Sequence, residues 1–128
     1  MSIGVTYDTG ALVALDRNER WMWLRHSALT EQDVIPTVPA PVLAEAWRGG
    51  PRQARLANAL AFCRIEVLSE RQARAVGELA GRAGHPDIVD VCVVEGALRR
   101  GDRVVTSDRP HLEAVVDALG ARLVIADA

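Results

Sequence analysis

Four acidic residues of this chain stand at positions that could do chemistry: Asp8, Glu45, Asp90 and Asp108. Asp8 ends the stretch VTYD and Asp108 ends the stretch VVTSD, so both are expected where a β-strand has just finished. In open α/β sheets the carboxyl ends of the strands line the functional crevice. Carboxylates that converge there repel one another, and a divalent cation removes that penalty. The pattern predicts a metal site suited to hydrolysis of a phosphate ester, where the cation activates water and neutralises the developing charge.

The types of ligand available indicate which metal such a site would take. Oxygen ligands favour Mg²⁺ or Mn²⁺, and no set of His and Cys residues has the spacing of a zinc site. The histidines His26, His85 and His111 are isolated in the sequence, and we expect them at the surface or in turns. The number of ions, one or two, stays open.

Asp90 has the most informative setting of the four. Val93, Val94 and Ala97 follow it at i+3, i+4 and i+7, which places the carboxylate on the apolar face of a helix. An unpaired charge on that face would be costly, so a cation or a partner is expected. Asp87 comes one turn earlier and is expected to be the N-cap of this helix, with an additional role in the metal site as the alternative.

The other acidic residues also have ordinary structural explanations. Glu45 lies in the apolar stretch PVLAEAW, where it faces either the metal site or an ion pair with Arg48 at i+3. Asp8 could be a helix N-cap. Asp108 could be one too, unless Ser107 caps the following helix and leaves the carboxylate available.

Length and composition indicate one globular domain. The chain has 128 residues, of which 49% are hydrophobic, and it has no apolar run long enough to cross a membrane. The N-terminal stretch MSIGVTYD lacks the features of a signal peptide, so we expect a cytoplasmic protein with no membrane partner. In that compartment Cys63 and Cys92, both among apolar neighbours, are expected to be core residues rather than a disulfide.

The charged residues both restrict and suggest functions. The formal net charge of −2 argues against a general nucleic-acid binder. All basic residues are arginine, and they form clusters that are either solvated faces or phosphate contacts: Arg48, Arg52, Arg55, and Arg99, Arg100, Arg103. The absence of lysine from the sequence excludes P-loop NTPases, Schiff-base enzymes and phosphorylated receiver domains.

Strand and helix patterns alternate along the chain. Strands are expected at 3–7, 34–38, 65–68, 103–106 and 122–125, and helices at 10–16, 19–29, 42–48, 51–61, 71–83, 88–100 and 110–119. Such alternation predicts βαβ units, and therefore an α/β domain with a mostly parallel central sheet and helices on both faces.

Three motifs, taken in order, resemble a known family. They are YDTGALVALD, VPAPVLAEAWRGG and DIVDVCVVEGALRRGDRVVTSD. In sequence and spacing they are similar to those of PIN-domain ribonucleases, and within these to the VapC-type toxins of toxin–antitoxin modules. The resemblance covers nearly the whole chain and implies a single PIN domain over 1–128.

The resemblance also implies an activity and a set of site residues. It carries the acidic quartet of the family onto Asp8, Glu45, Asp90 and Asp108, and Asp90 fits better than Asp87 because of its distance to the VVTSD strand. Thr9 and Thr106 match small hydroxyl residues that hold carboxylates or water in similar sites. The implied protein is an Mg²⁺-dependent endoribonuclease, with Mn²⁺ as the other candidate metal. Its implied partners are an RNA substrate, a second copy of the chain, and a VapB-type antitoxin that inserts a C-terminal segment near the active site.

Two other functions stay open on the sequence. A catalytically silent PIN module would bind RNA or a protein, although such a module gains nothing from several repelling carboxylates. A PIN nuclease could instead process housekeeping RNA or structured DNA without any antitoxin.

The tryptophans suggest a contact surface. Trp21 and Trp23 are two residues apart in an expected helix, so they cannot share one face. One of them is therefore expected to be partly exposed, either as a contact in a dimer or with an antitoxin, or as simple packing at the edge of the core.

Overall fold

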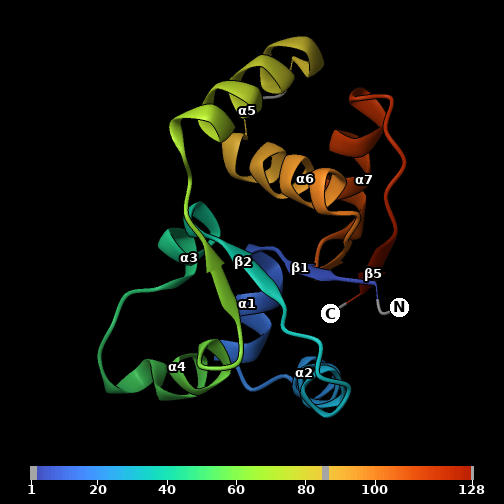
Figure 1. The fold of residues 1–128 in the computed structure, drawn as a ribbon. Helices are drawn as coiled ribbons and strands as arrows, with labels where there is room; N and C mark the ends of the chain where they lie inside the picture. The colour runs from blue at the N-terminus through green and yellow to red at the C-terminus, as the bar shows by residue number, and fades with distance from the viewer. Residues whose placement is uncertain (1–2, 85–86, 128) are drawn as a thin grey trace.

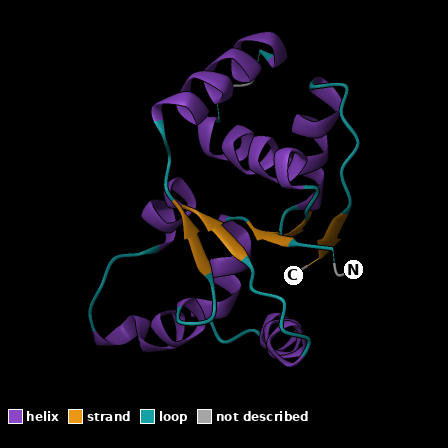
Figure 2. Ribbon diagram, in the orientation of Figure 1, coloured by secondary structure: helices purple, strands orange, loops and turns teal. Residues whose placement is uncertain are grey.

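The computed structural model describes residues 3–84 and 87–127, which form a single α/β domain around a five-stranded parallel sheet (Figures 1 and 2). Its strands are β1 (Val5–Tyr7), β2 (Thr37–Pro39), β3 (Arg64–Glu66), β4 (Arg103–Thr106) and β5 (Ile125–Asp127). They lie in the order β3-β2-β1-β4-β5. The chain moves outward from β1 in one direction to β2 and β3, and in the other to β4 and β5. The point between β1 and β4 is therefore where ligands bind in folds of this kind.

Helices cover both faces of the sheet, as the alternating pattern predicted (Figure 2). They are α1 (Thr9–Asp16), α2 (Arg20–Glu31), α3 (Ala40–Ala46), the 3₁₀ turn η1 (Pro51–Gln53), α4 (Ala54–Leu60), α5 (Glu70–Ala83), α6 (Ile88–Arg100) and α7 (Arg109–Ala118). In Figure 1, α5, α6 and α7 lie on one side of the strands, and α1, α2 and α4 lie on the other. Within residues 3–84 and 87–127, no helix has the length and apolar character needed to cross a bilayer.

The core consists of apolar side chains on both sides of the sheet. Leu12 and Leu15 of α1 are fully buried, as are Val93 and Val94 of α6 and Val104 of β4. Burying a side chain of this size stabilises a fold by about 1.5–3 kcal/mol relative to leaving it exposed. The residues of β1 are buried throughout, because a parallel strand covered on both faces has no side that meets water.

Several element boundaries differ from the expectation. The strand expected at 34–38 is Thr37–Pro39, and the one expected at 122–125 is Ile125–Asp127, where pairing with β4 sets the register. The helix expected at 51–61 is divided into η1 and α4. The reason is that the buried Gln53 side chain accepts hydrogen bonds from the backbone of Arg48 and Gly49, which ties η1 to the preceding loop.

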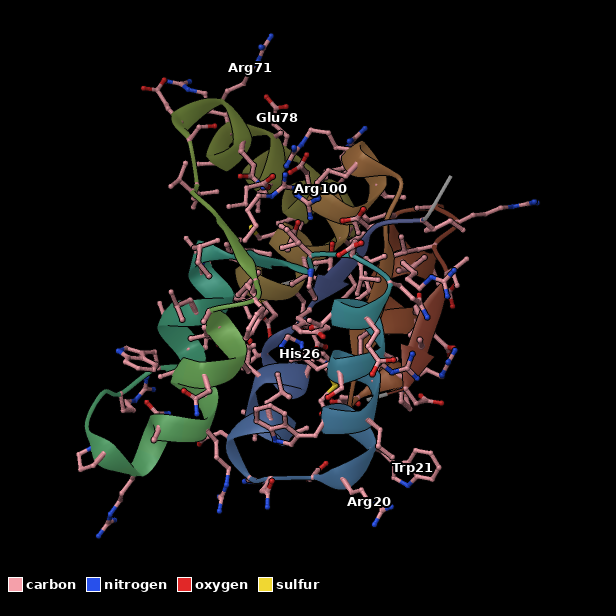
Figure 3. All side chains as sticks on the ribbon, turned by 60° about the horizontal axis from the view of Figure 1, so that its bottom comes forward. Arg20, Trp21, His26, Arg71, Glu78 and Arg100 are labelled. Carbon is pink, nitrogen blue, oxygen red and sulfur yellow. The ribbon has the colours of Figure 1, made fainter. Side chains whose placement is uncertain are left out.

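A network of ion pairs joins α6 to the sheet, and it gives a structural role to Arg99 and Arg100. Arg100, labelled in Figure 3, pairs with Asp102 at 2.9 Å and with Glu66 at 2.7 Å, and donates to the Thr6 hydroxyl at 2.9 Å. Arg99 also pairs with Glu66, at 2.7 Å. These guanidinium groups are therefore engaged in holding β1, β3 and α6 together.

Candidate metal centre

A cavity of about 370 Å³ opens at the carboxyl ends of the central strands. All four carboxylates singled out in the sequence line it, together with Asp87, Thr9 and His111. Although the chain has many arginines, none of the described ones lines this cavity. The full set of lining residues is Asp8, Thr9, Gly10, Val13, Glu45, Asp87, Asp90, Ser107, Asp108, His111 and Leu112.

Asp8 and Asp108 follow the two adjacent strands β1 and β4, and each is also a helix N-cap. Asp8 Oδ1 accepts the backbone N–H of Ala11 at 2.9 Å, and Asp108 Oδ1 accepts that of His111 at 3.4 Å. Asp108, and not Ser107, therefore caps α7. Both residues therefore cap a helix and also line the cavity.

The buried Thr106 connects these two carboxylates. Its hydroxyl accepts the backbone N–H of Asp108 at 2.9 Å and also hydrogen-bonds to the Asp8 carboxylate. Burial raises the pKa of Asp8, the hydrogen bonds from Thr106 and Ala11 oppose this rise, and the charge of Asp108 adds to it. Thr106 thus sets the position of Asp8 relative to Asp108.

Glu45 reaches the cavity from the last turn of α3. Its Oε1 accepts the Thr9 hydroxyl at 2.6 Å, which joins α3 to the start of α1. Arg48 instead donates to the carbonyl oxygens of Ala44 and Trp47. The ion pair between Glu45 and Arg48, which was the alternative, is therefore not formed among the described residues. Glu45 is exposed, although the stretch around it is apolar.

Asp87 and Asp90 enter from the first turn of α6. Asp87 is the N-cap, as expected, and accepts the backbone N–H groups of Val89 and Asp90 at 3.1 and 3.2 Å. Burial, followed by the negative charge of Asp87, raises the pKa of Asp90 to about 6, while His111 opposes this rise. Burial by itself would raise the pKa of Asp87 as well, but its hydrogen bonds from Asp90 and Val89 lower it. Of the two carboxyl groups, that of Asp90 is therefore the one that more readily holds a proton or another cation.

His111 is the residue of this cavity that the sequence did not indicate. Its Nε2 lies 2.5 Å from Asp90 Oδ2 and 3.8 Å from Asp87 Oδ2. Its position three residues after Asp108, in the first turn of a helix that begins at the same edge of the sheet, was the available signal. His26 differs from the expectation, because it lies on the buried face of α2 and hydrogen-bonds to the Tyr7 hydroxyl (Figure 3). His85 lies outside the described residues.

The donor set fits a divalent cation. Five carboxylates line one cavity, and the only described side chain there that can carry positive charge is His111. Bringing so many negative charges together is unfavourable without a counter-charge, and carboxylate oxygens are the ligands that Mg²⁺ and Mn²⁺ prefer. Among the described residues, one group has ligand atoms within 4.8 Å of one another, namely Asp87, Asp90 and His111, and of the four predicted ligands it contains only Asp90.

Two solved structures are similar to this chain over nearly their whole lengths. A chain of VapBC2 from Rickettsia felis, solved with a DNA fragment from its promoter, has a TM-score of 0.75 and 15% identity, covering 98% of this chain and 99% of that chain. PAE2754 from Pyrobaculum aerophilum has a TM-score of 0.63 and 19% identity, covering 99% of this chain and 92% of that chain. No protein-family model matches the sequence, and no curated protein does. At these identities the likeness establishes the fold, and it confirms the PIN-like α/β fold that was expected from the sequence.

Proposed function

We propose that this protein is a metal-dependent endoribonuclease and the toxin of a toxin–antitoxin pair, and that it hydrolyses RNA phosphodiester bonds in the acidic cavity. One observation carries the proposal: Asp8, Glu45, Asp90 and Asp108, from four separate parts of the chain, line a single cavity that no described arginine lines. Ion pairing with basic side chains would be the ordinary use of such carboxylates. This arrangement instead favours the binding of a cation that would also contact the substrate phosphate.

In this proposal Asp8, Glu45, Asp90 and Asp108 hold Mg²⁺ or Mn²⁺. When bound, the cation activates a water molecule and neutralises the charge that develops on the phosphate. Thr9 holds Glu45, and Thr106 holds Asp8 and the backbone of Asp108, so both hydroxyl residues fix the spacing of the ligands. Asp87 supports Asp90 by accepting its backbone N–H.

RNA is the proposed substrate, and the exposed arginines of the other cluster are the candidates for contact with its phosphates. Arg52 and Arg55 are both exposed and come shortly after α3, the helix that carries Glu45. Guanidinium groups bind phosphate oxygens well, because their planar fork donates two parallel hydrogen bonds. These residues are thus the better candidates for phosphate contact, since Arg99 and Arg100 are engaged with Glu66.

The proposed protein partners are an antitoxin and a second copy of the chain. Trp21 on α2 is 77% exposed and projects away from the helix (Figure 3). Trp23 instead packs against the core and donates to the Leu15 carbonyl oxygen. Trp21 and Leu24 line a cavity of about 680 Å³ together with Arg25. Large exposed aromatic side chains are enriched where proteins meet, which favours this face of α2 as a contact surface.

The test is incubation of the purified protein with a pool of cellular RNA that includes tRNA, in Mg²⁺, in Mn²⁺ or in EDTA. Discrete fragments that form only with metal would establish the ribonuclease and identify its target. RNA binding without cleavage in either metal would favour the catalytically silent module. Cleavage by a protein whose neighbouring genes encode no small DNA-binding protein would favour an RNA-processing nuclease without antitoxin.

A further inference from the structure

His111 occupies a place in the acidic cavity where a metal ligand would stand. Its Nε2 is 2.5 Å from Asp90 Oδ2 and 3.8 Å from Asp87 Oδ2. The side chain is 49% exposed and therefore open to the cavity rather than sealed in the core. Its own backbone N–H is held by Asp108 Oδ1, so the residue that carries the imidazole is fixed by another carboxylate of the same cavity.

Asp87, Asp90 and His111 offer ligand atoms that lie close enough together to be considered for one ion. Octahedral Mg²⁺ or Mn²⁺ sites have ligand distances of about 2.1 Å, which puts adjacent ligand atoms about 3 Å apart and opposite ones about 4.2 Å apart. In the structure Nε2 is within hydrogen-bond distance of Asp90 Oδ2, at 2.5 Å, and lies 3.8 Å from Asp87 Oδ2. One ligand atom from each of the three residues lies within 4.8 Å of the others, which is close to the span of such a coordination sphere.

The alternative is that His111 serves only as a positive partner of Asp90 and moves aside when a metal binds. The anchoring of His111 opposes this, because α7 begins at Arg109 and holds the His111 backbone against Asp108. A cation held by Asp90 would thus lie next to the imidazole, whose Nε2 lone pair can take a ligand position in place of water.

We propose that His111 is a nitrogen ligand of the metal ion in this cavity, which makes the site selective for Mn²⁺ over Mg²⁺. Imidazole binds divalent transition metals better than it binds Mg²⁺, which strongly prefers oxygen. The inference rests on the proposed function insofar as it assumes that the cavity binds a divalent cation. It goes further by naming a ligand outside the acidic quartet and a preference between metals.

Pulsed electron paramagnetic resonance of the Mn²⁺-loaded protein tests this directly, because a directly bound imidazole nitrogen gives a ¹⁴N coupling. We expect that coupling in the wild-type protein, its loss in His111→Gln, and its retention in the control His26→Gln, whose imidazole lies on the buried face of α2. Titration by calorimetry should show that His111→Gln weakens Mn²⁺ binding by about tenfold and leaves Mg²⁺ binding nearly unchanged. Absence of the coupling in the wild type, or its persistence in His111→Gln, would overturn the assignment.

The same samples separate this inference from the proposed ribonuclease. A ¹⁴N coupling in a protein that cuts no RNA would support the ligand assignment and count against the nuclease. RNA cleavage that depends on Mn²⁺, without the coupling, would support the nuclease and remove His111 from the metal.

Discussion

Gly10, at the start of α1, packs directly against Ser107 in the turn that follows β4. A Cβ atom on Gly10 would overlap the Ser107 hydroxyl and lie 3.1 Å from the Ser107 backbone nitrogen. The segments that carry Asp8 and Asp108 can approach this closely because residue 10 has no side chain. The distance between the two carboxylates thus depends on a glycine that takes no part in the chemistry.

Replacing Gly10 by alanine is therefore expected to push the turn with Ser107 and Asp108 away from Asp8. We expect a loss of about 1–3 kcal/mol in the free energy of unfolding, as for other overpacked positions, and weaker metal binding. The matched control is Gly77→Ala in the middle of α5, where an added Cβ meets nothing within 4 Å. The control should stabilise the protein by about 0.5–1 kcal/mol, because alanine favours the helix. Urea denaturation and metal titration measure both effects, and equal behaviour of the two variants would contradict the packing argument.

Asp90→Asn is expected to stabilise the metal-free protein at neutral pH. The pKa of Asp90 is raised to about 6 in the folded protein. The folded state therefore binds this proton more tightly than the unfolded state does, and the protein loses stability as the pH rises from about 4 through 6. Because the side chain is only 19% exposed, its removal should recover about 2–3 kcal/mol above pH 6.5 in EDTA. Mn²⁺ should raise the melting temperature of the wild type by ligand linkage but have little effect on the variant. Equal metal-induced shifts in both proteins would exclude Asp90 as a ligand.

The sequence was sufficient for the fold because each element had a strong local signal. The helix Ile88–Arg100 and the strand Arg103–Thr106 have the expected bounds, since the run VCVV and the run RVVT fit a buried helix and a buried strand. The last strand was misplaced because its residues pair only through β4, whose register no local pattern shows. Arg109 also bonds to Asp127, which fixes that strand from a distant part of the chain.

The site was less accessible to the sequence than the fold. The acidic residues could be named from their strand ends and helix face, and the structure places them on one cavity, but their role as metal ligands stays a prediction. The position of His111 three residues after Asp108 indicated this edge of the sheet, but its contact with Asp90 arises only from the packing of α7 beside α6. The exposure of Glu45 was likewise hidden, since an apolar stretch does not show where a short helix ends.

The buried His26 predicts how stability depends on pH. Burial lowers the pKa of His26, although a hydrogen bond to the Ala59 backbone partly opposes this. A lowered pKa in the folded state means that stability is fully present above about pH 6.5 and is lost as the pH falls through the folded pKa. In EDTA, the wild type should lose up to about 1.4 kcal/mol per pH unit more than His26→Gln over that range. Parallel pH profiles of the two proteins would show that His26 does not titrate differently on unfolding.

Trp21 is expected to matter for association and not for folding. Because the side chain is 77% exposed, Trp21→Ala should change the free energy of unfolding by less than about 0.5 kcal/mol. It should weaken self-association, or binding to the product of an adjacent antitoxin gene, by at least about tenfold. The control is Val67→Ala, which removes another apolar side chain that is 75% exposed. Sedimentation and calorimetry that find no difference between the variants would remove α2 from the contact surface.

The most direct test of the account is single-turnover cleavage of one RNA target by the wild type, Asp8→Asn, Asp90→Asn and the control Gly77→Ala, in Mg²⁺ and in Mn²⁺. The two carboxylates are proposed metal ligands from different elements, whereas Gly77 lies on α5 away from the cavity. The account predicts that both Asn variants lose cleavage by at least about a hundredfold while remaining folded, and that Gly77→Ala cuts like the wild type. Cleavage by either Asn variant at the wild-type rate would contradict the assignment of the acidic cavity as the active site.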